Sequence, residues 1–420
     1  MEDWKIGRLE DWKIGRSGGV KIMLETWRWF GPDDPVTCSD IRQAGADGIV
    51  TALHAAAPGE VWQADDIAAR KGFIEAEGLT WSVVESIPVH PAIKLGNDLA
   101  AQHIDGWIQT MRNLAANGLE VICYNFMPVV DWTRTDLRWK ARRGGLALRF
   151  DPVEFAAYDL FVLRRAGADR DYTAEIIAQA EALHASMAEA AIERLESTII
   201  AGLPGSELSH GREGIRAAIA DYDGLTAADL RANLIAFLEQ AGPAAEECGV
   251  RICLHPDDPP FSLFGLPRVV STKADYAALF DAVPTLVNGI TLCAGSLGSR
   301  PDNDVIDIAR SFAPRIHFTH LRNVTMEPSG AFFEDDHLDG GVDMVALISA
   351  LLGEEARRRE EGRADAVIPM RPDHGHLLLD DIGKQTNPGY SAIGRLKGLA
   401  ELRGVERAVA SLAYGREGSA

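Results

Sequence analysis

The sequence predicts an α/β protein folded as a (β/α)8 TIM barrel, with a helical insertion between strands four and five. Short apolar, β-branched runs recur along the chain, and polar, Gly or Pro residues and then a segment of helical periodicity follow each run. No GxGxxG follows a first strand and no GxxxxGK[ST] occurs, which disfavours an open nucleotide-binding sheet. The eight expected strands are residues 20–24, 48–53, 81–87, 120–126, 250–254, 289–293, 316–320 and 367–370.

The intervening segments carry helix start and stop signals. Residues 98–117 place apolar side chains at 3–4 spacing between Asn97, a candidate cap, and Gly118, a candidate stop. Thr226 with Asp229 resembles a capping box and opens the helix that leads into strand five. These signals predict helices of a barrel's outer ring.

About 120 residues separate strands four and five, which exceeds the single helix that a βαβ unit needs. Residues 172–200 are rich in Ala and Glu, with apolar side chains near helical spacing. We therefore expect a helical subdomain or dimerisation arm at about 132–225, within a single catalytic domain spanning 19–415. The arm suggests a homo-oligomer, a dimer or larger.

The first residues repeat themselves: EDWKIGR occurs at 2–8 and again at 10–16. A single identical repeat at the very start indicates a duplicated leader over 1–18, which we expect to be disordered or non-native. We exclude it from the fold prediction.

Composition narrows the function classes. The formal charge of −20 repels nucleic acid and anionic membrane surfaces, so neither is an expected partner. No apolar run is long enough to cross a membrane, and no secretory signal is apparent. The five cysteines are odd in number, scattered and without CxxC spacing, which indicates a reducing compartment and predicts a cytoplasmic protein.

Four consecutive strands in the second half end on metal-ligand residue types. Because active sites of such barrels lie at the carboxyl ends of the strands, we expect His255, Cys293, His320 and Asp373 to converge on one divalent metal. Alternation along the strand places His320 on the face of Phe318 and His317 on the opposite one.

Each ligand also has a structural explanation. Cys293 can be a small buried hydrophobe, and HPDD after strand five and PDHG after strand eight can be turns. Their joint placement at four neighbouring strand ends favours the metal site.

Several motifs together resemble the mannonate dehydratases, a family within the xylose-isomerase-like barrels. The resemblance runs from about residue 21 to 412 and includes LETWRWFG, ICLHPDDPP, LCAGSLG, IHFTHLRN, FEDDHLDGGVDM, MRPDHGH and NPGYSAIGRLKGL. Carried over by position, it implies the same four metal ligands, with Mn²⁺ or Fe²⁺ as the cofactor. It implies His374 and Tyr390 as the acid/base residues.

The reaction that the resemblance implies is that of a lyase in hexuronate catabolism, converting D-mannonate, a sugar acid, to 2-keto-3-deoxy-D-gluconate and water. It requires loss of the C2 proton and departure of the C3 hydroxyl, so two proton carriers are needed. His374 is the candidate base and Tyr390 the candidate acid, although the roles can be exchanged. Pro372 ends strand eight, so that both Asp373 and His374 can reach the cavity.

Further residues are weaker candidates. Arg371, His54, Asn125 and Arg322 can bind the substrate's carboxylate or hydroxyls, and barrel-mouth salt bridges are the alternative. The acidic segment 333–344 is a candidate lid over the substrate, with the paired glycines at 340 and 341 as hinges, and an acidic, solvated start of a helix is the alternative. Tyr390 has an alternative too, as a turn tyrosine after Asn-Pro-Gly.

Three rival functions remain at this stage. An aldose–ketose isomerase would share the barrel, the metal and a sugar-like substrate, but such enzymes use carboxylate-rich metal sites. A metal-dependent endonuclease is disfavoured by the charge. A non-catalytic sugar-acid binding protein is the alternative outside enzymes.

Overall fold

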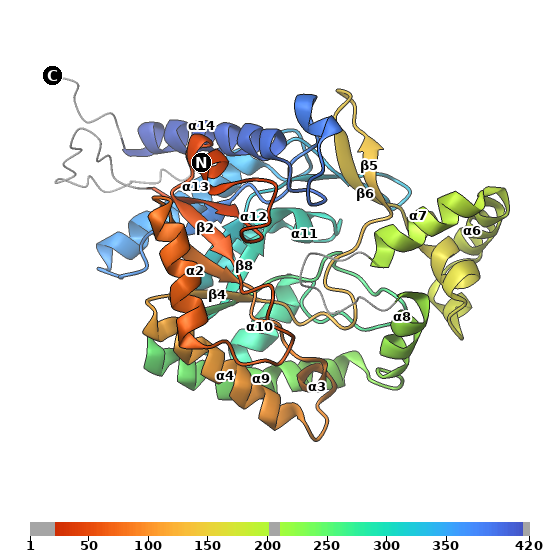
Figure 1. Cartoon of the computed structure of the whole chain (residues 1–420), viewed down its shortest axis with the longest axis horizontal. Helices are drawn as coiled ribbons and strands as arrows, with labels where there is room; N and C mark the ends of the chain where they lie inside the picture. Colours follow the sequence, from red (N-terminus) through yellow and green to blue (C-terminus); the bar gives the residue numbers. More distant parts are fainter. Residues whose placement is uncertain (1–21, 201–210, 415–420) are drawn as a thin grey trace, which may run out of the picture.

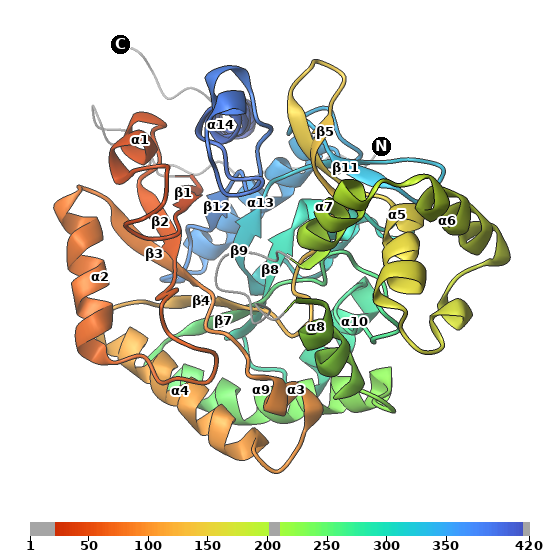
Figure 2. The same cartoon turned by 45° about the vertical axis from the view of Figure 1, so that its right-hand side comes forward.

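The computed structural model describes residues 22–200 and 211–414 and contains a closed barrel of eight parallel strands (Figures 1 and 2). Their order around the barrel is β1-β12-β9-β8-β7-β4-β3-β2, which confirms the predicted TIM barrel. The strands are β1 Leu24–Arg28, β2 Gly48–Thr51, β3 Thr80–Glu85, β4 Val121–Tyr124, β7 Arg251–Leu254, β8 Asn288–Cys293, β9 Ile316–His320 and β12 Pro369–Arg371. The predicted leader at 1–18 lies outside the described residues.

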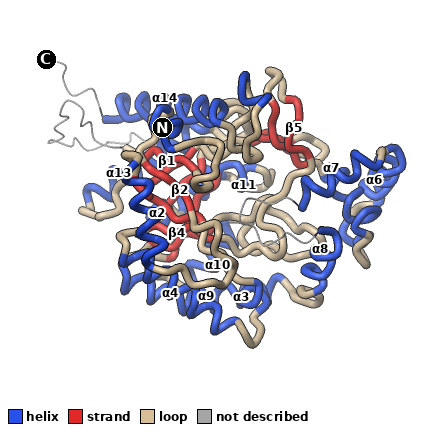
Figure 3. Tube along the Cα trace, viewed as in Figure 1, coloured by secondary structure: helices blue, strands red, loops and turns tan. Residues whose placement is uncertain are grey.

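Helices surround the strands, one main helix after each (Figure 3). They are α1 Cys38–Gln43, α2 Ala64–Ala76, α4 Ala100–Ala116, α9 Ala227–Cys248, α10 Lys273–Ala282, α12 Val305–Ser311, α13 Met344–Glu360 and α14 Ala392–Tyr414. The capping box of Thr226 and Asp229 is present at the start of α9. Short helices α3 Pro91–Leu95 and α11 Ala294–Gly298 lie in the loops before α4 and α12. Among the described residues, no helix has both the length and the apolar character needed to cross a membrane.

The first strand was predicted wrongly: β1 begins at Leu24, where the expected run of 20–24 ends. The strand continues through charged residues because each finds a partner. Glu25 accepts hydrogen bonds from the Arg403 guanidinium, and Arg28 is paired with Glu85. An apolar-run criterion does not detect a strand whose charged side chains are neutralised by distant elements.

The segment between β4 and α9 begins with a β-hairpin that the sequence analysis did not predict. Its strands, β5 Asp136–Lys140 and β6 Leu146–Phe150, join β10 Val324–Met326 and β11 Phe332–Glu334 in an antiparallel sheet of order β10-β11-β6-β5. The short helical elements that follow are α5 Pro152–Ala157, the π-helical turn Tyr158–Leu163, the 3₁₀ turn Ala168–Asp171, α6 Ala174–Ser186, α7 Glu189–Ile200 and α8 Gly211–Ala220. These helices lie beside the barrel (Figures 1 and 2) and share with the sheet an apolar cluster that includes Phe150, Phe155 and Phe332.

The interior of the barrel is closed by a small apolar layer of Val50, Val83, Val121, Cys123, Cys253 and Phe318. On a strand the residue two positions further faces the same side. Two positions after Val83, Cys123, Cys253 and Phe318 the sequence has Glu85, Asn125, His255 and His320. The polar site therefore sits directly above a dry layer, at the carboxyl ends of the strands.

Two buried carboxyls lie at the opposite end of the barrel. Glu355 accepts hydrogen bonds from the backbone N–H groups of Met23 and Ile368, just before β1 and β12. Burial, with Glu25 and Glu355 nearby, raises the pKa of Glu406 to about 8. Ionisation of Glu406 is thus less favourable in the folded chain than in the unfolded one.

We expect Glu406→Gln to stabilise the protein at about pH 9 and to have little effect at about pH 5. The folded-state pKa is raised, so the stability present below the ordinary glutamate pKa is lost as pH rises through about 8. Melting temperatures at the two pH values should show a gain of about 2 °C or more only at the higher one. Glu181→Gln, at an exposed position of α6, is the control, and an equal shift of the Glu406 variant at both pH values would contradict this account.

Candidate metal centre at the mouth of the barrel

Three side chains from neighbouring strands form a group able to hold a metal ion. His255 follows β7, Cys293 ends β8 and His320 ends β9, and their ligand atoms all lie within 4.8 Å of one another. The closest pair is Nε2 of His255 and Nδ1 of His320, 3.2 Å apart. His317 takes no part, since its Nε2 lies 2.8 Å from the carbonyl oxygen of Leu286 on the other face of β9.

Asp373, the fourth predicted ligand, adjoins this group. Its Oδ2 lies 3.9 Å from Sγ of Cys293 and 3.7 Å from Nδ1 of His320. β12 ends at Arg371, and after Pro372 the backbone of Asp373 turns into the left-handed region with φ +64°. Asp is one of the few non-glycine residues that enter this region readily. The turn keeps both Asp373 and His374 buried.

The protonation states suit a divalent cation. The Arg322 guanidinium and hydrogen bonds from His255 and His320 hold the pKa of the Cys293 thiol well below its usual range, although burial opposes them. The pKa of Asp373 is also well below its usual range, because Arg371, His374, His320 and Arg322 outweigh burial. Thiolate, carboxylate and imidazole are the forms that bind first-row divalent metals. The residues present therefore fit such an ion.

Glu85, which the sequence analysis did not select, stands behind the ligands. Its Oε1 lies 3.5 Å from Nε2 of His320 and accepts a hydrogen bond from Nη2 of Arg371 at 3.0 Å, and Oε2 lies 3.5 Å from Nη1 of Arg28. A carboxylate at the second nitrogen of a metal-binding histidine fixes the ring's orientation and tautomer. Arg371 also donates to Asp373. Its contacts therefore match the alternative of a barrel-mouth salt bridge, which was set against substrate binding for this residue.

Four buried charged residues next to the centre form a closed set of ion pairs, which we call the arginine–carboxylate ring. Arg134 donates to Asp258 at 2.9 Å and to Glu334 at 2.7 Å, and Arg322 pairs with the same two carboxylates. Nε of Arg322 lies 2.8 Å from Oδ2 of Asp373. Arg322 thus has three carboxylate partners. These contacts match the alternative that Arg322 forms barrel-mouth salt bridges instead of binding the substrate.

The predicted acid/base residues lie side by side. The rings of His374 and Tyr390 meet edge to face with centroids 5.1 Å apart, and Nδ1 of His374 lies 3.1 Å from Oε1 of Glu334. Burial raises the pKa of Tyr390 to about 12, against the opposing effect of Arg371. Its phenol is therefore protonated at neutral pH and can act as a proton donor.

The wall next to Tyr390 is built by Phe30 and His54. The ring of Phe30 contacts Tyr390 at 4.8 Å and His54 at 5.6 Å between centroids. Burial, with Arg28 and Arg70, lowers the pKa of His54 to about 3, so the imidazole is neutral. Among the described residues neither of its nitrogens has a hydrogen-bond partner. Asn125 follows β4 and is half-buried.

The acidic segment 333–344 is held in place by several contacts. Its first residues belong to β11, Asp336 pairs with Arg143 of the hairpin turn and with Lys397, and Asn323 binds the carbonyls of His337 and Val342. A Cβ at Gly340 would clash with the side chain of Asn323. Close packing thus accounts for this glycine, which the sequence analysis had assigned to a lid hinge.

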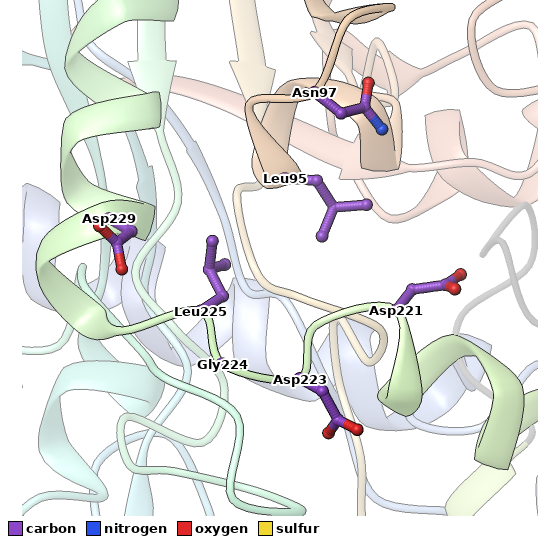
Figure 4. A pocket seen from close by; sticks show the side chains of 7 residues that line it. All are labelled: Leu95, Asn97, Asp221, Asp223, Gly224, Leu225 and Asp229. Atoms are coloured by element: carbon purple, nitrogen blue, oxygen red, sulfur yellow. The ribbon is translucent and has the colours of Figure 1, made fainter.

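An acidic pocket of about 600 Å³ lies elsewhere, between the α3–α4 connection and the loop before α9 (Figure 4). Its carboxylates include Asp229, which is already engaged in capping α9 through Thr226. It shares no lining residue with the metal centre.

Four residues that surround the candidate centre were not selected from the sequence, namely Glu85, Arg134, Asp258 and Glu334. Glu85 had a signal, since it is an acidic residue within the predicted apolar strand 81–87. Asp258 lay within a quoted motif but was given no role, and Glu334 was considered only as part of the candidate lid 333–344. Arg134 gave no signal, because it enters the site from the connection that precedes the unpredicted hairpin.

Comparison with known proteins identifies the family of this chain. The family model described as D-mannonate dehydratase (UxuA) matches residues 23–415. "Mannonate dehydratase 2" of Agrobacterium fabrum is 57% identical over 387 residues, covering 92% of this chain and 97% of the relative. The mannonate dehydratase of Chromohalobacter salexigens is 54% identical, with 93% and 100% covered.

A solved structure gives the same result. The crystal structure of mannonate dehydratase from Streptococcus suis serotype 2 superimposes with a TM-score of 0.74 at 31% identity, covering 95% of this chain and all of that one. Family match, sequence identity and fold agree over nearly the whole length. The chain belongs to the D-mannonate dehydratase family.

Proposed function

We propose that the chain converts D-mannonate to 2-keto-3-deoxy-D-gluconate and water, with Mn²⁺ or Fe²⁺ held by His255, Cys293, His320 and Asp373. The observation that carries the proposal is the convergence of these ligands from four adjacent strands beside the His374–Tyr390 pair. When bound, the ion supplies the positive charge that makes a proton next to a carboxylate removable.

The two proton carriers divide the remaining work. His374 accepts the C2 proton, and Tyr390, whose phenol is protonated at neutral pH, donates to the departing C3 hydroxyl. Both side chains are buried, so water is largely excluded from the reacting atoms. The aromatic contacts with Phe30 and Trp132 hold the two rings.

Substrate hydroxyls or the carboxylate are proposed to meet His54 and Asn125. His54 is neutral and its nitrogens are unpaired among the described residues, so it can donate and accept without losing an internal bond. Arg371 and Arg322, paired with carboxylates, are proposed to hold Asp373 in place.

The state of the cysteines bears on the proposed cellular location. The five cysteines are free thiols, four of them buried, which supports a reducing, cytoplasmic location. We also propose a role in hexuronate catabolism and a homo-oligomeric state, which analytical ultracentrifugation can test.

The purified protein loaded with Mn²⁺ or Fe²⁺ should form a 2-keto-3-deoxy acid from D-mannonate. Product formation measured with a periodate–thiobarbiturate assay tests this directly. Formation of a ketose from an aldose, with no dehydration of mannonate at full metal loading, would favour the isomerase instead.

Cys293→Ala should lose most of the bound metal while the barrel stays folded, because the thiolate is a ligand at a strand end. Metal analysis and circular dichroism measure the two effects. Cys253→Ala is the matched control: it removes a buried thiol from the apolar layer one step below and should keep its metal. Full occupancy in Cys293→Ala would exclude this residue from the centre.

His374→Gln and Tyr390→Phe should each lower kcat by about 10²–10⁴-fold, the usual contribution of a positioned proton carrier. KM and metal content should change little, since neither side chain is proposed as a metal ligand. Steady-state kinetics with metal analysis check this, with His184→Gln in α6 as a control. Wild-type kcat in either variant would remove that residue from the proposed pair.

A further inference from the structure

The contact between Glu334 and His374 joins two separately built parts of the protein. Glu334 is the last residue of β11 in the antiparallel sheet, whereas His374 follows the barrel strand β12. Oε1 of Glu334 lies 3.1 Å from Nδ1 of His374, and both side chains are only 4% exposed. Nε2 of His374 lies on the side of the metal ligands, 3.8 Å from Oδ1 of Asp373.

Glu334 is an ionised acceptor in a fixed position. Arg134 and Arg322 both donate to the same Oε1, at 2.7 and 2.5 Å, and both are anchored by Asp258. Arg322, His374 and Arg134 hold the pKa of Glu334 well below its usual range although burial opposes them. An ionised carboxylate can only accept hydrogen bonds. Nδ1 of His374 therefore carries the hydrogen of this bond, and Nε2 is the nitrogen that faces the proposed ligands.

We propose that Glu334 is a positioning residue for the dehydration: it holds the imidazole of His374 in the tautomer and orientation that direct the Nε2 lone pair toward the metal centre. The inference rests on the proposed role of His374 as proton carrier. Glu334 itself touches no reacting atom, because its only contact with the pair is through Nδ1.

The arginine–carboxylate ring explains why this contact is rigid. Two guanidiniums bind the same carboxylate oxygen that contacts His374, so that the carboxylate cannot rotate without breaking ion pairs. Glu334 Oε2 has no hydrogen-bond partner among the described residues, and the charge-assisted bonds therefore all converge on the oxygen that faces His374.

A double-mutant cycle with Glu334→Gln and His374→Gln tests the proposal. Glu334→Gln should lower kcat by about 10²-fold with KM changed less than about threefold, since an amide can present its N–H to Nδ1 and favour the other tautomer. The double variant should be no slower than His374→Gln alone, because Glu334 acts through His374. Glu334→Asp, which keeps the charge for the two arginines, should recover part of kcat. Glu327→Gln, in the β10–β11 turn of the same sheet, is the control and should have wild-type kinetics.

The possible outcomes distinguish the proposed role of His374 as proton carrier from the proposed role of Glu334 as its positioning residue. Wild-type kcat in His374→Gln would overturn the proposed function of that residue. A large loss in His374→Gln together with wild-type kcat in Glu334→Gln, or losses that multiply in the double variant, would overturn the positioning role alone. If Glu334→Gln does not fold by circular dichroism, Glu334→Asp replaces it in the cycle, with the same criterion of non-additivity.

Discussion

The pairing of buried charges at the mouth of the barrel is the constraint on which the rest of the structure depends. Removing an ion from water costs several kcal/mol even after relaxation, so a buried charge without a partner is not tolerated. Here Glu85, Asp258, Glu334, Asp373 and the thiol of Cys293 are all buried, and each faces a guanidinium or an imidazole. The proposed metal ligands are preorganised because their surroundings are already neutralised.

Elements outside the barrel supply some of the charged residues that this pairing requires. The barrel strands and the residues directly after them supply Arg28, Glu85, Arg371 and the four proposed ligands, whereas Arg134 comes from the connection before β5 and Glu334 from β11. These two residues are aligned because β6 pairs with β11 and the sheet packs on its own apolar cluster. Apolar packing in the antiparallel sheet, away from the site, thus keeps Arg134 and Glu334 in the positions where they neutralise the buried charges.

Strand periodicity and local sequence signals determine which of the site residues could be predicted from the sequence. His255 and His320 are predictable because each lies two positions beyond a residue of the apolar layer, and the strand periodicity carries its side chain to the same face. Asp373 is predictable because Pro372 ends the strand. His374 and Tyr390 required the family resemblance, since their local sequences also suit ordinary turns. Arg134 was not predictable, because its direction depends on a hairpin of short strands in which buried and exposed residues do not alternate regularly.

The left-handed backbone of Asp373 restricts which residues can stand at this ligand position. Glutamate would preserve the negative charge and a carboxylate oxygen, but it enters this φ region with strain. Asparagine suits the backbone but brings no charge, which would leave two guanidiniums undercompensated. The backbone conformation at position 373 tolerates asparagine, and the charge balance tolerates glutamate. Aspartate is the residue that meets both requirements.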